Sequence, residues 1–243
     1  MDQGVLAESL PASLPGAVLR PAAGNAFETT VEQLATAIRL GVLRDGELLP
    51  PERVLAEQLG VSRNTLREAI AALRDSGLVT TRRGRGGGSV VTYAVPTPPR
   101  TPAVRMGPAL ADALDFRRIV EPGAAALAAT RTLAADQRAW LQQALDEACV
   151  AVEPSHRLAD SRLHLAIATV AGSPMLMEAV TRAQAALGEL LGAIPVMRRN
   201  IDHSDDQHQA MVRAILAGDP EEARRVMEEH CDGTAALLRG LIG

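Results

Sequence analysis

The sequence predicts a mainly α-helical protein, with an N-terminal winged helix-turn-helix and a C-terminal all-α antiparallel helical bundle. Two observations carry this prediction. Three helical segments and one β-prone hairpin fall within residues 27–94, and a stretch with five prolines follows at 95–108. From 109 to 243, strand signals are absent and Ala, Leu, Glu and Arg recur at helical spacing, which is typical of a bundle.

Composition places the protein in the cytoplasm. Hydrophobic residues make up 47% of the 243 positions, which is enough to build real cores. No apolar run reaches the roughly 20 residues that a membrane span needs. The N-terminus has Asp2 and Glu8 instead of the basic start of a signal peptide, and two cysteines are too few for a disulfide framework. We therefore expect a cytoplasmic protein without membrane association.

The first elements follow from apolar spacing and from chain breaks. Residues 1–26 have several Pro and Gly and no clear periodicity, which predicts a flexible N-terminal arm. Apolar residues at helical spacing predict a helix from Phe27 to Gly41. A second helix is expected to begin at Pro51, because proline suits a first helical turn, and to end at Gly60.

The third helix and the hairpin complete the N-terminal module. Ser62 is a good N-cap and Gly77 a good terminator, so the third helix lies between them. Two β-prone runs, 78–81 and 89–93, flank a basic, glycine-rich tip. Three helices followed by a basic hairpin predict a winged helix-turn-helix. The five prolines at 95–108 then predict a stiff linker to the second module.

The third predicted helix carries side chains suited to DNA. Arginine can pair bidentately with guanine and asparagine with adenine, and hydroxyls at a helix N-terminus can hold phosphates. A single arginine could instead be a solvated surface residue, whereas the ordered set favours DNA binding. The candidate contacts at the start of this helix are Ser62, Arg63, Asn64, Thr65 and Arg67, and those in the wing are Arg82, Arg83 and Arg85.

Charge is distributed unevenly along the chain. The formal net charge is −4, which by itself does not suit DNA binding. Residues 60–90, however, contain six arginines against two acids, whereas 105–243 contain 14 arginines against 19 acids. A basic first module beside an acidic second module is the pattern expected if only the first binds phosphates.

The second module, 109–243, predicts about six helices. Asp219 with Glu222 and Ser204 with Gln207 match the spacing of a capping box, and Pro220 suits a first helical position. The expected helices span roughly 109–130, 134–152, 155–171, 174–193, 204–217 and 220–241.

Histidines of this module suggest a metal site. Asp160 and His164 are four residues apart and share one helix face, while His208 and His230 lie on the fifth and sixth predicted helices. Three antiparallel helices could bring these side chains together. Three imidazoles and one carboxylate suit Zn²⁺, Ni²⁺ or another divalent first-row metal.

Spacing alone leaves the ligand set open. His156 also precedes Asp160 by four residues, and His203 lies near His208. A lone histidine on a helix is more often exposed or hydrogen-bonded than a ligand. The same cluster could also serve a hydrolytic centre, but no further motif supplies a general base or a substrate pocket. We therefore do not expect an enzyme.

The N-terminal module resembles the GntR superfamily of repressors. The resemblance rests on residues 49–73, which read LPPERVLAEQLGVSRNTLREAIAAL, on GLV at 77–79 and on GRGGGSVV at 84–91. The family more often carries threonine where this chain has Asn64. The resemblance implies that the DNA contacts include Arg53, Arg63, Thr65, Arg67, Arg85 and Gly86.

Residues 110–235 are similar to the FCD domain, the effector module of the FadR subfamily. RRIVE at 117–121, DSRLH at 160–164 and MEEH at 227–230 carry this resemblance. In many members the matching residues bind a metal, which implies Asp160, His164, His208 and His230 as the ligands here. The resemblance also makes Arg117 a candidate partner of an anionic effector, with an ion pair to Glu121 as the equal alternative.

Together these resemblances imply a ligand-responsive regulator. We expect a homodimer that binds an inverted repeat in double-stranded operator DNA and that a small organic acid releases. Repression is the expected direction, with activation left open. One alternative is a metal-free regulator that senses a fatty acid or acyl-CoA in an apolar cavity. A more remote alternative is a metal-dependent hydrolase.

Overall fold

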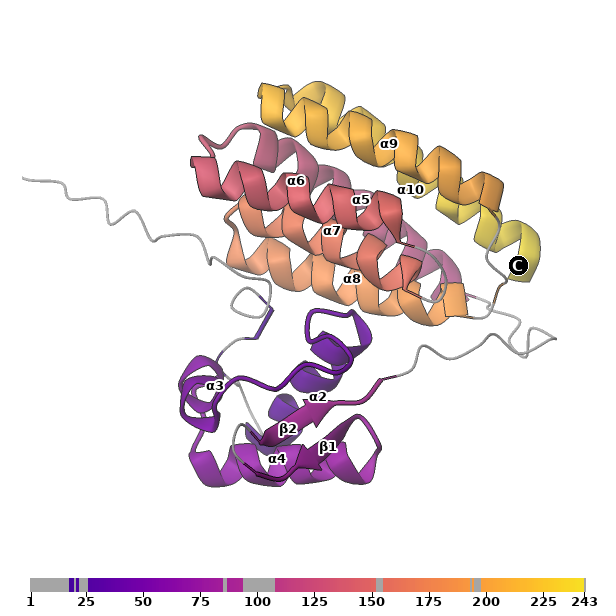
Figure 1. Cartoon of the computed structure of the whole chain (residues 1–243). Helices are drawn as coiled ribbons and strands as arrows, with labels where there is room; N and C mark the ends of the chain where they lie inside the picture. The colour runs from indigo at the N-terminus through magenta and orange to yellow at the C-terminus, as the bar shows by residue number, and fades with distance from the viewer. Residues whose placement is uncertain are drawn as a thin grey trace, which may run out of the picture.

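The N-terminal part of the chain folds into a winged helix-turn-helix (Figure 1). Its elements are α2 (Ala26–Arg39), α3 (Glu52–Leu59), α4 (Arg63–Asp75), β1 (Val79–Arg82) and β2 (Gly88–Val91). The computed structural model describes residues 18–19, 21, 26–84, 87–93, 108–151, 155–192, 194 and 198–242. Over these residues the predicted fold class is confirmed.

The turn between α3 and α4 is built by a glycine and a capping serine. Gly60 has a φ of 62°, a left-handed conformation that favours glycine, and its amide bonds back to the end of α3. Ser62 is the N-cap of α4, because its Oγ accepts a hydrogen bond from the Thr65 amide at 3.0 Å. This turn leaves the first residues of α4 on the outside of the domain.

The wing has a third segment along its edge. β1 and β2 pair antiparallel from Val79 opposite Val91. Residues 46–49 add to this sheet, with a bridge between Leu48 and Val90 and a hydrogen bond of 2.9 Å from the Gly46 amide to the Val91 carbonyl. The sequence analysis did not predict this segment, because a pairing of a few residues leaves no alternating pattern of its own.

The C-terminal part of the chain is an all-helical bundle (Figure 1). Within it, α5 packs against α7, α8, α9 and α10, while α6 packs against α7 and α9. Because α5 is surrounded by four other helices, polar side chains on its inner face lie deep in the bundle. The helices are α5 (Pro108–Ala129), α6 (Ala135–Val150), α7 (His156–Val170), α8 (Pro174–Gly192), α9 (Arg198–Ala217) and α10 (Pro220–Ile242).

The last two helices begin differently from one another. α10 begins as predicted, with the Glu222 amide donating to Asp219 Oδ1 at 3.0 Å and Pro220 in the first position. α9 begins at Arg198, well before the predicted start at Ser204. Ser204 is therefore inside the helix and the predicted capping box there is wrong. No proline or glycine between 198 and 204 stops the helix from extending backward.

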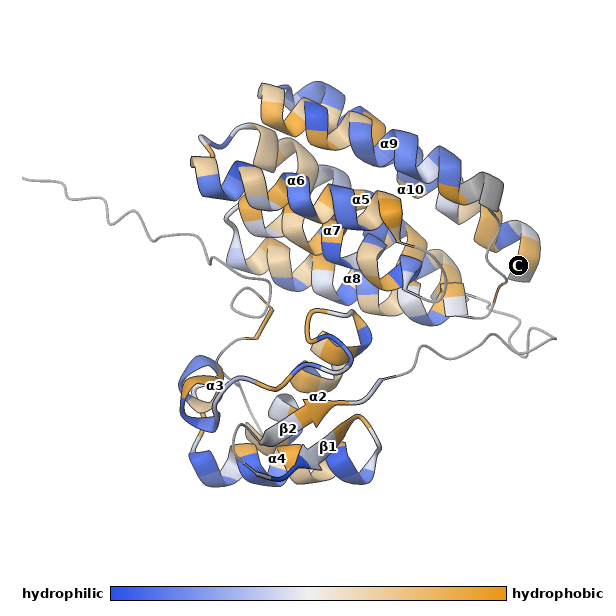
Figure 2. Ribbon diagram, in the orientation of Figure 1, coloured by the Kyte–Doolittle hydropathy of each residue, from blue (hydrophilic) through white to orange (hydrophobic). Residues whose placement is uncertain are grey.

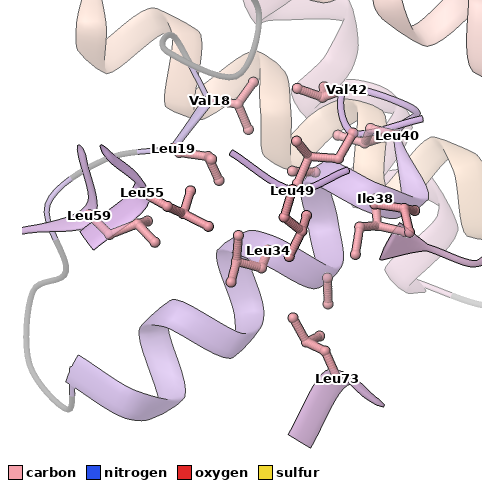
Figure 3. Close-up of a cluster of buried hydrophobic side chains, with 14 of the residues drawn as sticks. Val18, Leu19, Leu34, Ile38, Leu40, Val42, Leu49, Leu55, Leu59 and Leu73 are labelled. Atoms are coloured by element: carbon pink, nitrogen blue, oxygen red, sulfur yellow. The ribbon is translucent and has the colours of Figure 1, made fainter. Parts of the chain in front are cut away.

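One core cluster joins the two domains. Its members from the winged helix-turn-helix include Leu34, Ile38 and Leu55, which converge in Figure 3. Its members from the bundle include Leu165 and Met177. Burial of apolar area stabilises packing by roughly 25 cal/mol per Å². The winged helix-turn-helix therefore rests on the bundle through a continuous apolar contact.

The N-terminal arm contributes to this same cluster. Val18 and Leu19 are buried, with 7% and 2% of their surface exposed, and Figure 3 shows both beside the core. The predicted flexible arm, 1–26, is therefore corrected at these two positions, because two adjacent apolar side chains find a place in the core. The remainder of the arm up to residue 17 lies outside the described residues.

Two further clusters lie within the bundle. One gathers side chains of α5, α6, α7, α9 and α10, including Leu141, Leu163 and Met211. The other joins α5, α8 and α10 at the opposite end, around Leu114 and Leu238. Hydrophobic and hydrophilic residues alternate along α9 and α10 in Figure 2, as expected for helices with one buried face. None of the described helices is long and apolar enough to cross a membrane.

Candidate DNA-binding surface and metal centre

The start of α4 presents the predicted DNA-contacting side chains to solvent. Arg63, Asn64 and Arg67 are exposed, and Thr65 is half-buried beside the Ser62 cap. The opposite face of α4 is buried through Leu66, Ala69, Ile70 and Leu73. Since the apolar face packs the helix onto its domain, the exposed face can enter a DNA groove without a change in that packing.

Several of these side chains are paired with acids of their own domain. Arg67 Nε bonds to Glu52 at 2.8 Å, and Asn64 Nδ2 bonds to Glu68 at 2.8 Å. Arg63 makes no hydrogen bond or ion pair with any residue in the described part of the chain. It is therefore the side chain of this helix that can meet DNA without first breaking a contact.

Arg53, on α3, is also exposed, and its Nη1 pairs with Glu57 at 2.9 Å. Such exposed pairs contribute about 0–1 kcal/mol, so exchanging Glu57 for a phosphate costs little. The wing residues Arg85 and Gly86 lie outside the described residues. Next to them, Gly87 has a structural role, because a Cβ there would collide with the Arg82 carbonyl oxygen.

The four predicted metal-ligating residues converge in the bundle. Asp160 and His164 come from α7, His208 from α9 and His230 from α10. One ligand atom from each lies within 4.8 Å of all the others. The imidazole centroids are 4.7 to 5.5 Å apart, and all three rings are buried. The structure therefore brings together the whole predicted set, from three helices.

Neighbouring groups orient two of these imidazoles. His164 Nδ1 lies 2.9 Å from Glu121 Oε2, although the contact is not a well-aligned hydrogen bond. His230 Nδ1 lies 3.3 Å from Gln207 Oε1. In each ring Nδ1 faces a polar neighbour, which leaves Nε2 as the atom available to an ion. Orientation of this kind is typical of histidines that ligate metals.

The protonation states suit a metal centre. Burial, together with the other imidazoles and Arg117, lowers the pKa of His208 to about 4, although Asp160 opposes this shift. Burial also lowers the pKa of His230 well below its ordinary value, and His208 and Arg117 add to the effect. Both rings are therefore neutral at pH 7, which is the form that binds metal.

Some ring nitrogens of the cluster are buried without a hydrogen bond, and a bound ion would pair one of them in each ring. Nε2 of His164 and Nε2 of His208 have no hydrogen-bond partner among the described residues, although His208 Nε2 lies 3.3 Å from Asp160 Oδ1. Leaving buried polar atoms unpaired costs about 1–3 kcal/mol each. Three imidazoles and a carboxylate are also the donor chemistry that Zn²⁺ and similar divalent ions prefer. The residues present thus fit a metal ion.

Two other histidines do not join this set. His156 is buried on α7, but it supplies no atom to the cluster. His203 is exposed on α9. We therefore do not count either of them among the candidate metal ligands.

Arg117 extends the site beyond the metal cluster. Its side chain is buried, and its Nε donates to Glu121 Oε2 at 2.9 Å. Its two terminal nitrogens, Nη1 and Nη2, are buried without a hydrogen-bond partner among the described residues. The ion pair with Glu121 is thus present, yet both ends of the guanidinium fork remain free. A guanidinium in this state suits the two oxygens of a carboxylate.

Glu121 links Arg117 to the metal cluster. Burial alone would raise the pKa of Glu121, but the charge of Arg117 and the contacts with His164 and Gln184 outweigh it and lower the pKa to about 2. The carboxylate is therefore ionised, and its Oε2 lies 2.9 Å from both Arg117 Nε and His164 Nδ1. Through this one oxygen, Arg117 and the histidine cluster form one continuous buried site.

Sequence reasoning missed two members of this site. Glu121 entered only as an ion-pair partner of Arg117, and Gln184 was not singled out. Gln184 is fully buried on α8, and its Nε2 donates to Glu121 Oε1 at 2.6 Å. The available signal was a polar residue within the apolar stripe of α8, three residues before Leu187 and four after Val180.

Family comparisons match both domains. The family described as "Bacterial regulatory proteins, gntR family" matches residues 27–88, and the family described as "FCD domain" matches residues 112–233. The two matches fall on the winged helix-turn-helix and on the helical bundle that holds the histidine cluster.

Individual relatives span most of the chain. A protein of Mycobacterium gastri, named as the HTH-type transcriptional regulator RmpR, is 36% identical over 212 residues, covering 84% of this chain and 76% of that protein. The Glc operon transcriptional activator of Escherichia coli (strain K12) is 29% identical over 227 residues, covering 84% and 85%. The structure of E. coli McbR/YncC has a TM-score of 0.55 at 21% identity, covering 91% and 100%, which is a likeness of fold.

Proposed function

This chain belongs to the GntR family of bacterial regulatory proteins and carries an FCD domain, and we propose that it is a metal-containing repressor released from its operator by a small carboxylate. It is a transcriptional regulator and not an enzyme. The observation that carries the finer proposal is the continuous buried site that joins the free guanidinium fork of Arg117 to four side chains able to hold a metal ion.

DNA recognition is assigned to the first turn of α4. The unpaired Arg63 would read a base edge, and Asn64 a second, while Arg53, Ser62, Thr65 and the wing residues Arg85 and Gly86 would hold phosphates. Arg67 would exchange its pair with Glu52 for DNA. A homodimer would place two such helices on an inverted repeat, because two-fold proteins generally read two-fold operators.

The effector domain is assigned a metal held by Asp160, His164, His208 and His230. A divalent ion at these residues would supply open coordination positions for oxygen atoms of a ligand. Arg117 would pair with the ligand's carboxylate, and Glu121 would hold both Arg117 and His164 in place. To act allosterically, the ligand must bind better to the arrangement that does not bind DNA.

The metal-free alternative, an acyl-CoA or fatty-acid sensor, fits this bundle less well. A fatty acid could pair its carboxylate with Arg117, but its apolar chain would leave the buried histidine nitrogens unpaired, which is costly. The direction of control is a separate matter, since one relative is named as an activator. We assign repression here because release on effector binding is the simplest result of a shift in the two DNA-binding domains.

The testing experiment selects DNA from a random library with the full chain, purified without a histidine tag and used metal-loaded and metal-free. We expect enrichment of an inverted repeat by the wild type and by Arg239→Ala, an exposed arginine at the far end of α10. Arg63→Ala should fail to enrich it, since a bidentate base contact contributes roughly 1–3 kcal/mol. Enrichment of nothing in either metal state would refute operator binding.

The selected DNA then reports on the effector site. Small carboxylates should release it from the metal-loaded protein, and His230→Ala should lose both bound metal and release. His203→Ala, an exposed histidine on the neighbouring helix, is the matched control and should keep both. Metal content near zero in the untagged wild type, together with release by acyl-CoA, would favour the metal-free alternative instead.

A further inference from the structure

Gln184 offers a buried hydrogen-bond acceptor that nothing in the described structure uses. It lies on α8 with no exposed surface, between buried Val180 and Leu187. Its Nε2 is occupied by Glu121, but its Oε1 is buried without a partner. Buried amide oxygens are normally hydrogen-bonded, so an unpaired one beside a ligand site points to a group that the ligand brings.

The orientation of the Gln184 amide is fixed by chemistry. Glu121 already receives Arg117 Nε on its Oε2, and a carboxylate can only accept hydrogen bonds. Turning the Gln184 amide over would place its oxygen against Glu121 Oε1, where the 2.6 Å contact now lies, and would lose that bond. The free end of the amide is therefore the oxygen, and it needs a donor.

Gln184 and Arg117 are held on the two oxygens of the same carboxylate. Glu121 Oε1 binds Gln184, and Glu121 Oε2 binds Arg117. The free donors of Arg117 and the free acceptor of Gln184 therefore belong to two side chains that one buried carboxylate holds together. A ligand that satisfies both must carry an acceptor pair, such as a carboxylate, and a donor close to it.

The charge of the site decides what kind of donor this is. Arg117 brings a positive charge, and Glu121, the carboxylate next to Gln184, is already engaged by it. An ammonium group here would face a like charge without a free carboxylate to offset it. A hydroxyl is neutral and donates equally well, so it is the better complement to Gln184 Oε1.

We propose that Gln184 determines effector specificity: its Oε1 accepts a hydrogen bond from a hydroxyl next to the effector's carboxylate, so the site prefers hydroxy acids. This inference rests on the proposed effector site at Arg117. A ligand without the hydroxyl leaves the amide oxygen unpaired. The cost of leaving this buried oxygen unpaired corresponds to a binding preference of about 5- to 150-fold for the hydroxy acid.

The experiment measures binding by calorimetry to the full, metal-loaded chain with three matched pairs of acids. The pairs are glycolate and acetate, L-lactate and propionate, and L-malate and succinate. Wild-type protein should bind the hydroxy acid of at least one pair more tightly by the stated factor. Gln184→Met, which keeps the length of the side chain but lacks the acceptor, should bind both members of that pair equally. Gln142→Met, on the exposed face of α6, is the matched control and should keep the preference.

The outcomes separate this inference from the function on which it rests. If the wild type binds both members of every pair equally, the role of Gln184 is overturned, while the proposed carboxylate site stands. This outcome does not depend on whether the variant folds. A hydroxy-acid preference that persists in folded Gln184→Met also overturns it. If no acid binds the metal-loaded wild type, the proposed carboxylate site fails and this inference fails with it.

Discussion

The buried guanidinium of Arg117 divides its donors between a structural partner and a free position. Its Nε is held by Glu121 at 2.9 Å, and its terminal nitrogens are unpaired among the described residues. Burying a charge is costly unless it is paired, so Glu121 makes the burial possible without using the whole fork. At the scale of single residues, one ion pair thus allows Arg117 to be buried while two of its nitrogens stay unpaired.

The buried imidazoles predict acid sensitivity of the metal-free protein. The pKa of His208 is lowered to about 4, so between about pH 6.5 and 4 the unfolded chain binds more protons than the folded one. The free energy of unfolding should therefore fall as the pH drops through this window. For this one ring the slope is at most about 1.4 kcal/mol per pH unit.

Urea unfolding of chelator-treated protein, followed by the fluorescence of Trp140 on α6, measures this slope. His208→Gln, which cannot be protonated, should unfold with a visibly shallower pH dependence over the same range. Identical slopes for the two proteins would contradict the assignment of a depressed pKa to His208.

At the scale of elements, α10 and α9 differ in whether the predicted capping motif lies at the start of the helix. Asp219 caps α10 through a hydrogen bond from the Glu222 amide, within a few residues of chain. Ser204 has the same spacing to Gln207 but sits inside α9, where its Oγ lies 3.5 Å from His230 Nδ1. A capping motif therefore acts only where the chain before it leaves the helix.

Asp219→Ala should lower the free energy of unfolding by about 0.5–2 kcal/mol, because the first amides of α10 lose their acceptor. Ser204→Ala should change it by no more than about 0.5 kcal/mol, since alanine is favourable within a helix. Chemical denaturation of both variants in the same buffer compares them. A larger loss for Ser204→Ala than for Asp219→Ala would reverse this assignment.

At the scale of the whole molecule, α7 connects the histidine cluster to the DNA-binding domain. It carries Asp160 and His164, and its Arg162 contacts Glu147 of α6 at 3.4 Å. Glu147 also binds Arg44 of the DNA-binding domain at 2.7 Å. Burial and the charge of Arg44 lower the pKa of Arg162, so Glu147 offsets a repulsion between two arginines from different domains.

Glu147→Gln should weaken this contact between the domains, because Arg44 and Arg162 would lose the carboxylate that pairs with both of them. Arg44 and Glu147 are partly exposed, so the expected loss is about 1 kcal/mol or less. In calorimetry the DNA-binding domain should unfold at a lower temperature, while metal binding is unchanged. Glu222→Gln, which removes an exposed pair with Arg225 on α10, is the control, and equal thermograms for both variants would argue against the role of Glu147.

The sequence by itself determined the elements and most of the histidine site. Apolar spacing, the Ser62 cap and the terminating Gly60 are local features, so they predicted α2 to α4 and the wing. The i, i+4 spacing of Asp160 and His164 is equally local. Spacing did not choose among five histidines, and the family resemblance supplied the other two ligands that the structure brings within reach.

Only the tertiary structure decided which distant side chains meet. Gln184 reaches Glu121 because α8 packs on α5, and Val18 enters the core that joins the domains. The 46–49 segment became part of the wing sheet in the same way. Helix and strand periodicity shows which face of an element is apolar, but it does not show which other element packs against that face. These contacts are set by how the buried faces fit together, and the orphaned donors of Arg117 and the free oxygen of Gln184 follow from that fit.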